Sequence, residues 1–183
     1  DYQADGVLLQ VDGFLADGGS DTIQTGNGTN TVIGGNGALD IIEDGGGTTN
    51  SNVVVGDSGT LTYDASGVLT GLSTTDVDGT LTGGADQITL GGGTNIVAGG
   101  MNADTITVGD GDNVVLGDNG TLTYTGGVAS YLSQALSSDP DQGDDDTITA
   151  GDGVNLVLGG QLDDTITVGD GTNLVLGDHG QVD

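Results

Sequence analysis

The chain has 183 residues, of which 28 are acidic and 39 are glycine, and it contains no lysine, arginine or cysteine. A formal net charge of −28 would repel a phosphate backbone or an anionic membrane surface, so we expect neither as a partner. The chain can form no disulfide, has no apolar run long enough to span a bilayer, and shows no signal peptide.

A long repeat is visible at Tyr2, Tyr63 and Tyr124, which are 61 residues apart. Natural repeat domains usually carry distinct capping repeats, and none is evident at either end. We therefore expect one continuous array that is an excerpt of a longer one. Its three approximate units are residues 1–62, 63–123 and 124–183.

A shorter repeat of nine residues is visible at Ile88, Val97, Ile106 and Val115. A strand of four or five residues and a glycine-rich turn fill nine residues, so two nonapeptides make an 18-residue coil. Helices are not expected, because glycine and β-branched residues dominate every segment. The pattern predicts an all-β fold, a parallel β-solenoid with 18-residue coils.

Along the chain, the nonapeptides are interrupted by residues 60–84 and again by residues 121–143. Each interruption reads as strand, turn, strand and loop, and it forms either a third, wider coil of the solenoid or a hairpin that leaves the stack. We favour the wider coil, because a departing hairpin would break the ladder and expose strand edges. Three coils would give each unit a rise of about 14 Å.

Aspartates and asparagines alternate at the ends of the turns. Asp21, Asp86, Asp104, Asp146 and Asp164 occupy one column, and Asn30, Asn52, Asn95, Asn113, Asn155 and Asn173 occupy the other. Stacked side-chain amides can bond along the stack and close the turn. Carboxylates stacked about 4.8 Å apart instead repel by about 3.5 kcal/mol per pair at an effective dielectric of 20.

No basic side chain can neutralise such a column, so a hard cation is expected. Carboxylates with glycine carbonyls suit Ca²⁺ better than Mg²⁺, and zinc is disfavoured because the chain has no cysteine and only His179. Aspartate beside glycine is also a common turn residue, which would explain an isolated pair but not a column. The candidate ligands are Asp21, Asp40, Asp57, Asp86, Asp104, Asp118, Asp146, Asp164 and Asp178, with Asp110, Asp152 and Asp170 in the second column.

The nonapeptides resemble the repeats-in-toxin (RTX) family, also called hemolysin-type calcium-binding repeats, whose pattern is GGxGxDxUx. Residues 99–107, GGMNADTIT, fit that pattern except for Asn102 in place of glycine. The resemblance covers about two-thirds of the chain. It implies a parallel β-roll with Ca²⁺ between successive turns, as in the arrays of giant bacterial surface adhesins.

The two kinds of strand predict two different faces. Strands such as Thr105-Ile106-Thr107 place isoleucine inward and threonine outward, in rows that include Gln24, Gln87, Asp40 and Ile42. The other strands are apolar on both sides. Val115, Val157 and Val175 point inward, whereas Val114, Leu116, Leu156, Leu158, Leu174 and Leu176 point outward. This outward stripe needs a cover, either the segment that contains Leu122 and Tyr124 or another chain.

We find no catalytic set, since cysteine and lysine are absent and His179 has no relay partners. The favoured function is an extracellular structural protein, a calcium-stabilised segment of a surface fibre, stalk or adhesin that associates with itself or continues in the same chain. One alternative is a module that binds ice or a glycan through its threonine face. Another is a calcium-dependent folding and secretion module attached to a separate activity.

Overall fold

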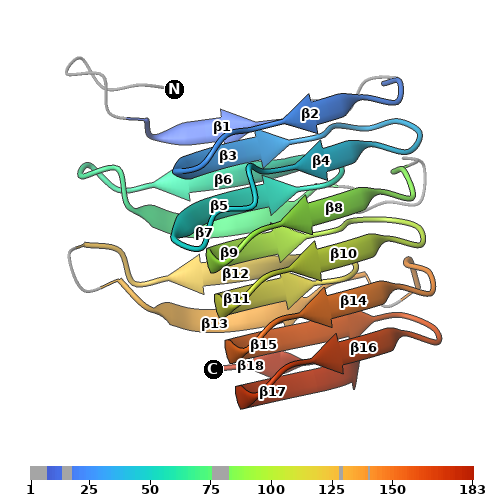
Figure 1. The fold of residues 1–183 in the computed structure, drawn as a ribbon. Coiled ribbons are helices and arrows are strands. Elements are labelled where there is room, and N and C mark those ends of the chain that lie inside the picture. Colours follow the sequence, from blue (N-terminus) through green and yellow to red (C-terminus); the bar gives the residue numbers. More distant parts are fainter. Residues whose placement is uncertain (1–7, 14–17, 76–82, 128–129, 140) are drawn as a thin grey trace.

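The computed structural model describes residues 8–13, 18–75, 83–127, 130–139 and 141–183. Every regular element in this part of the chain is a β-strand, so the all-β prediction is confirmed. The strands form three sheets of six strands each, stacked as layers (Figure 1). Over the same residues, no helix occurs that could cross a membrane.

Two of the sheets are parallel, with their strands in chain order. The outer sheet contains β2 (Thr22–Gln24), β4 (Ile41–Glu43), β8 (Gln87–Leu90), β10 (Thr105–Val108), β14 (Thr147–Ala150) and β16 (Thr165–Val168). The central sheet contains β3 (Thr29–Ile33), β5 (Asn50–Val55), β9 (Gly93–Ala98), β11 (Gly111–Leu116), β15 (Gly153–Gly160) and β17 (Gly171–Asp178).

The third sheet, here called the hairpin sheet, is antiparallel. It contains β1 (Gln10–Asp12), β6 (Gly59–Tyr63), β7 (Leu69–Thr74), β12 (Gly120–Tyr124), β13 (Leu132–Ser137) and β18 (Gln181–Val182).

The chain passes back and forth between the outer and central sheets, and each return adds one strand to each sheet. Equivalent residues pair in register, so Ile106 lies between Ile88 and Ile148 in the outer sheet. This register persists across the first interruption, where β4 pairs with β8 and β5 pairs with β9. The nine-residue period therefore predicts the parallel pairing correctly.

The inner core lies between the outer and central sheets. It is made of isoleucines from the outer strands and valines from the central strands, including Ile106, Ile148, Val115 and Val157, all with 0% exposure. Val175 pairs with Val157 in register but is 40% exposed, because β17 is the last strand of the central sheet. The predicted inward positions are thus confirmed at Val115 and Val157.

The wider coil predicted for residues 60–84 and 121–143 is wrong, because each interruption forms a hairpin. Leu61 pairs with Leu72 across β6 and β7, and Leu122 pairs with Ala135 across β12 and β13, in both cases antiparallel. A hairpin that left the stack would expose its strand edges, but β7 pairs with β12, β6 with β1 and β13 with β18. In the described residues, β1 and β18 are the edge strands of the resulting sheet. The hairpins form a sheet with one another while the parallel ladders continue beside them.

The hairpin sheet covers the apolar outward face of the central sheet. Leu61, Leu72 and Leu122 from the hairpins are fully buried against residues such as Leu116 and Leu158. Of the two predicted covers, the one from the same chain is therefore present. Leu174, on the edge strand β17, is an exception with 48% exposure.

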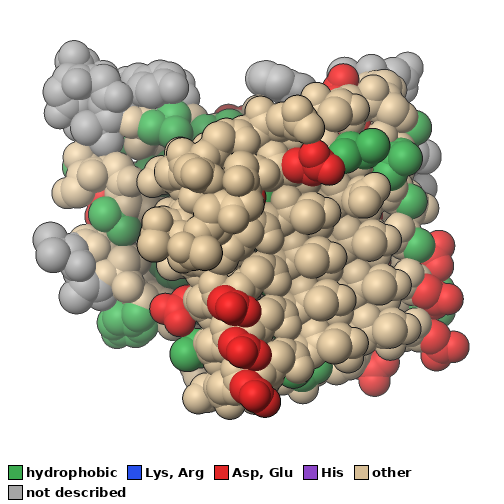
Figure 2. All heavy atoms as spheres, in the orientation of Figure 1, with side chains coloured by type: hydrophobic (Ala, Val, Ile, Leu, Met, Phe, Trp, Pro, Cys, Tyr) green, Lys and Arg blue, Asp and Glu red, His purple; other side chains and the backbone are tan. Residues whose placement is uncertain are grey.

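The free face of the outer sheet carries the predicted threonine rows. Figure 2 shows it as a broad, mostly uncharged polar surface with acidic groups at its margins. One row runs in register through Thr89, Thr107, Thr149 and Thr167, all exposed. The residues that interrupt the rows in β4 are Ile41 and Glu43 rather than Asp40 and Ile42, because Ile42 points inward with 1% exposure.

Candidate metal-binding site in an aspartate ladder

One aspartate precedes each strand of the outer sheet, and these aspartates are joined in a ladder. Its members are Asp21, Asp40, Asp86, Asp104, Asp146 and Asp164. At each of the five steps, the backbone N–H of one aspartate donates to Oδ1 of the next, at 2.7 to 2.9 Å. The parallel register of the outer sheet holds the carboxylates in this column.

The second oxygen of the ladder carboxylates has a different environment. In the described part of the chain, Oδ2 of Asp86, Asp104, Asp146 and Asp164 is buried and has no hydrogen-bond partner. Asp86, Asp104 and Asp146 are each only 1% exposed. A buried carboxylate oxygen without a partner is costly, so each of these groups needs a proton or a cation.

Glycines bring backbone carbonyl oxygens close to these Oδ2 atoms. A Cβ added at Gly99 would collide with both Asp104 Oδ2 and the carbonyl oxygen of Gly117. The same pairing recurs one step along, where a Cβ at Gly117 would collide with Asp146 Oδ2 and the Gly159 carbonyl. Only glycine fits there, and each site combines a carboxylate oxygen with a carbonyl oxygen, the donor types that hard cations prefer.

The electrostatics of the ladder also indicate a need for positive charge. Burial raises the pKa of Asp86 to about 6 and that of Asp146 to about 8. Burial, and after it the neighbouring Asp146 carboxylate, raises the pKa of Asp104 well above its ordinary value. Without a cation, part of the ladder therefore keeps its protons at neutral pH.

Two other predicted ligands, Asp57 and Asp118, instead accept backbone hydrogen bonds where a hairpin returns to the outer sheet. Asp57 is fully buried, and its two oxygens accept from the N–H groups of Gly84 and Met101, both at 2.7 Å. Asp118 accepts in the same way from Asp144 and Gln161. The equivalent Asp178 is exposed at the end of β17. At Asp57 and Asp118, these hydrogen bonds join the start of each hairpin to the turns that lead into the outer sheet.

The remaining predicted ligands, Asp110, Asp152 and Asp170, form an exposed column in the turns that precede the central strands. The N–H of Asp152 donates to Asp110 Oδ1 at 2.9 Å, and that of Asp170 donates to Asp152 Oδ1 at 2.6 Å. Because these carboxylates face water, they have less need of a bound cation than the buried ladder.

The asparagine column forms the predicted amide ladder. Nδ2 of Asn95 donates to Oδ1 of Asn113 at 2.8 Å, and Asn113 donates in turn to Asn155 at 2.7 Å. Asn113 Nδ2 also donates to the carbonyl of Gly109 at 3.0 Å, which closes the turn. An amide carries both a donor and an acceptor, so this ladder needs no added charge.

Sequence reasoning did not single out Asp44. Its carboxylate accepts from the N–H groups of Gly46 and Gly91 and from the side chains of Asn50 and Asn52, at 2.7 to 2.9 Å. Although burial opposes it, these hydrogen bonds lower the pKa of Asp44. Asp44 directly follows Glu43, which pairs with Thr89, so it takes the place that Leu90 has in the next coil, where the repeat has an apolar residue. The repeat therefore gave no signal for an aspartate there.

In the described ranges, no group of three or more histidine, cysteine or acidic side chains lies close enough to hold a metal ion. A cation in the ladder would therefore depend on backbone carbonyl oxygens as well as carboxylates. No protein-family model matches the chain, and neither a curated protein nor a solved structure matches it.

Proposed function

We propose that this chain is a segment of an extracellular structural protein, a calcium-stabilised β-solenoid of the repeats-in-toxin kind that forms part of a surface fibre, stalk or adhesin. The observation that carries the proposal is the column of buried, unpartnered Oδ2 atoms at Asp86, Asp104, Asp146 and Asp164. The chain has no lysine or arginine to neutralise that column, so the charge must come from outside.

Calcium fits the donor set of the ladder. The Oδ2 atoms of Asp86, Asp104, Asp146 and Asp164 would hold it together with the carbonyl oxygens of Gly99, Gly117, Gly159 and Gly177. A bound Ca²⁺ supplies the positive charge that lets these carboxyls ionise inside the structure. Extracellular modules commonly work at millimolar calcium, which suits a site built from one carboxylate per turn.

The back-and-forth winding between two parallel sheets supports the solenoid. Each unit of about 60 residues adds two strands to each sheet, as β8 and β10 do in the outer sheet and β12 and β13 do in the hairpin sheet. Strands lie about 4.8 Å apart, so one unit would rise about 9.6 Å along the axis. This replaces the 14 Å expected for three coils.

Self-association or continuation of the array is supported by the ends of the sheets. In the described structure, β2 and β3 end the two parallel sheets on one side, and β16 and β17 end them on the other. In the hairpin sheet, Val11 of β1 and Val182 of β18 both pack in the same core row as Leu61 and Ala135. Another coil could therefore extend all three layers without a change of register.

Circular dichroism with divalent ions tests the proposal. Strand content should be low or unstable without metal, should rise with millimolar Ca²⁺, and should respond less to Mg²⁺, which demands stricter octahedral coordination. Full and stable strand content in chelator at pH 8 would contradict the calcium requirement. Fibre diffraction of Ca²⁺-loaded arrays with no reflection near 4.8 Å would contradict the fibre.

A binding module is the second candidate, favoured by the exposed, in-register threonines of β8, β10, β14 and β16. A flat row of hydroxyl and methyl groups can order water or contact a sugar. Thermal hysteresis of a Ca²⁺-loaded solution would support ice binding, and its absence would exclude it.

A further inference from the structure

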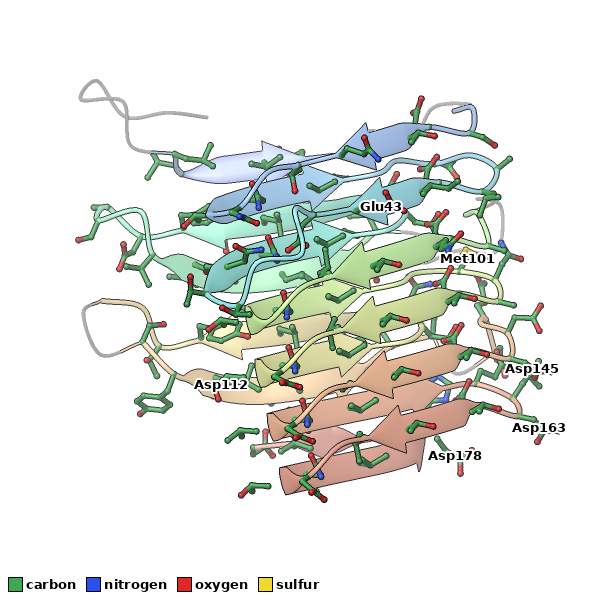
Figure 3. The ribbon with its side chains drawn as sticks, viewed as in Figure 1. Glu43, Met101, Asp112, Asp145, Asp163 and Asp178 are labelled. Atoms are coloured by element: carbon green, nitrogen blue, oxygen red, sulfur yellow. The ribbon has the colours of Figure 1, made fainter. Side chains whose placement is uncertain are left out.

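A groove of about 460 Å³ opens between the central sheet and the β12–β13 hairpin. The hairpin side of the groove is lined by Tyr124, Ser130, Tyr131 and Leu132. The central-sheet side is lined by Thr94, Ile96, Asp112, Asn113, Val114, Val154 and Leu156. Figure 3 labels Asp112, which lies beside the ends of the central and hairpin strands. A concave, mostly apolar site of this size with a few polar groups is typical of ligand pockets.

The β6–β7 and β12–β13 hairpins differ in the hydrogen bonding of the tyrosine that faces the central sheet. In the first hairpin, the phenol of Tyr63 bonds with the hydroxyl of Thr31 at 3.2 Å. Tyr124 stands 61 residues later, but Ile96 occupies the position that corresponds to Thr31, directly after the ladder asparagine. Within the described residues, the hydroxyl oxygens of both Tyr124 and Ser130 are buried and without a partner.

These two hydroxyls indicate what an occupant must provide. Burial raises the pKa of Tyr124, so its phenol stays protonated at neutral pH. A neutral O–H in a buried site costs free energy until it finds an acceptor. Backbone carbonyls of a peptide supply acceptors, whereas a free alkyl amine supplies only donors.

The charge of the groove indicates which side chain the peptide carries. Asp112 is exposed at its margin, and the chain has a net charge of −28, which excludes anionic occupants. Tyr131 and Val154 are 65% and 54% exposed, so an aliphatic stem could lie along them with its cationic end at Asp112 and the Tyr131 ring.

We propose that this groove binds a basic side chain, lysine or arginine, on an extended peptide segment of a different protein. The 183 residues contain no lysine or arginine, so neither they nor a second copy of them can supply the basic side chain. The inference rests on the second hairpin and is independent of calcium in the aspartate ladder.

A nuclear magnetic resonance titration of the Ca²⁺-loaded chain at physiological salt tests this directly. The probes are the capped tripeptides Gly-Lys-Gly and Gly-Arg-Gly, the neutral Gly-norleucine-Gly, and 1,5-diaminopentane. At least one basic peptide should give saturable shifts at Val114, Tyr131 and Val154, and the norleucine peptide and the diamine should bind at least several-fold more weakly.

Matched variants separate a site from diffuse attraction by the acidic chain. Asp112→Asn should weaken binding several-fold, and Tyr131→Ala should weaken it about two- to fivefold, as expected for loss of an exposed cation–π contact. Asp163→Asn removes another exposed charge, away from the groove, and should leave the affinity unchanged. Equal effects of the two aspartate variants, equal binding of the norleucine peptide or the diamine, or no saturable shift would overturn the proposal.

Discussion

The backbone N–H of Asp104 donates a 2.7 Å hydrogen bond to Oδ1 of Asp146, which lies 42 residues later in the chain. This bond satisfies one oxygen of the Asp146 carboxylate and leaves Oδ2 buried, with no partner in the described residues. The same division occurs at Asp86, Asp104 and Asp164, so the ladder concentrates its unmet need for positive charge in one column.

Replacing Asp104 by asparagine should stabilise the metal-free chain and reduce the benefit of calcium. The new Oδ1 can still accept from the Asp86 N–H, and an amide nitrogen in place of Oδ2 can donate to the Gly117 carbonyl, which lies against the same glycine. We expect a gain of about 1–2 kcal/mol without metal. Urea unfolding of the wild type and Asp104→Asn, with and without Ca²⁺, measures both effects.

The control for this variant is Asp163→Asn, an exposed aspartate outside the ladder. It should change the unfolding free energy by less than about 0.5 kcal/mol in either condition. If Asp104→Asn is destabilised without metal, or keeps the full stabilisation by Ca²⁺, the buried oxygen does not have the role assigned to it.

The metal-free chain should lose stability as pH rises from about 4 to about 8. The pKa values of Asp86 and Asp146 are raised in the fold to about 6 and about 8, so the folded chain binds more protons than the unfolded chain over this range. Each titrating group then contributes a slope of up to about 1.4 kcal/mol per pH unit. Saturating Ca²⁺ should flatten the slope.

Urea midpoints at pH 5, 6, 7 and 8 in metal-free buffer check this dependence. The pKa values of Asp44 and Asp64 are lowered by hydrogen bonds, so their contribution is lost only below about pH 4, outside this window. A metal-free stability that is constant or that increases over the series would be inconsistent with a buried, partly protonated ladder.

The sequence predicts the parallel sheets because equivalent residues recur every 18 positions, two nonapeptides apart, and stack on themselves. Ile88 and Ile106 pair in register as that spacing requires. The hairpins were not predictable in this way, because their correct assignment depends on contacts between separate segments. Leu72 pairs with Leu122, and nothing local in either segment shows that they meet.

Replacing Asn113 by aspartate should destabilise the fold by about 2–5 kcal/mol. The Nδ2 of Asn113 donates to both Asn155 Oδ1 and the Gly109 carbonyl, and a carboxylate would face both as a buried acceptor. Thermal or urea unfolding measures the loss. Asn173→Asp at the exposed end of the ladder should cost clearly less, and an equal cost would show that burial is not the cause.

The hairpin sheet should contribute to stability through its buried leucines. Leu122 has 0% exposure between the hairpin and central sheets, so Leu122→Ala should cost about 2–5 kcal/mol. Leu174 is 48% exposed, and Leu174→Ala should cost less than about 1 kcal/mol. Similar small losses for both would mean that the hairpins do not cover the central sheet in solution.

The candidate site was predictable as a column but not in its detail. Of the twelve predicted aspartates, the six of the ladder come directly before an outer strand and the other six directly follow a glycine. The sequence does not show that Asp104 leaves its Oδ2 without a partner in the described residues, whereas each oxygen of Asp57 accepts a backbone N–H. That difference depends on where the hairpin returns to the outer sheet. The amide ladder was predictable, because an asparagine needs only another asparagine in register.

Calorimetric titration of the metal-free chain with Ca²⁺ at pH 7, in two buffers of different protonation enthalpy, tests the central claim most directly. At this pH, calcium in the ladder must displace the proton held by Asp146, whose pKa is raised to about 8 by burial. We predict saturable binding that is tighter than for Mg²⁺ and that releases protons. Weak, non-saturating uptake that is equal for both ions and releases no protons would contradict the claim.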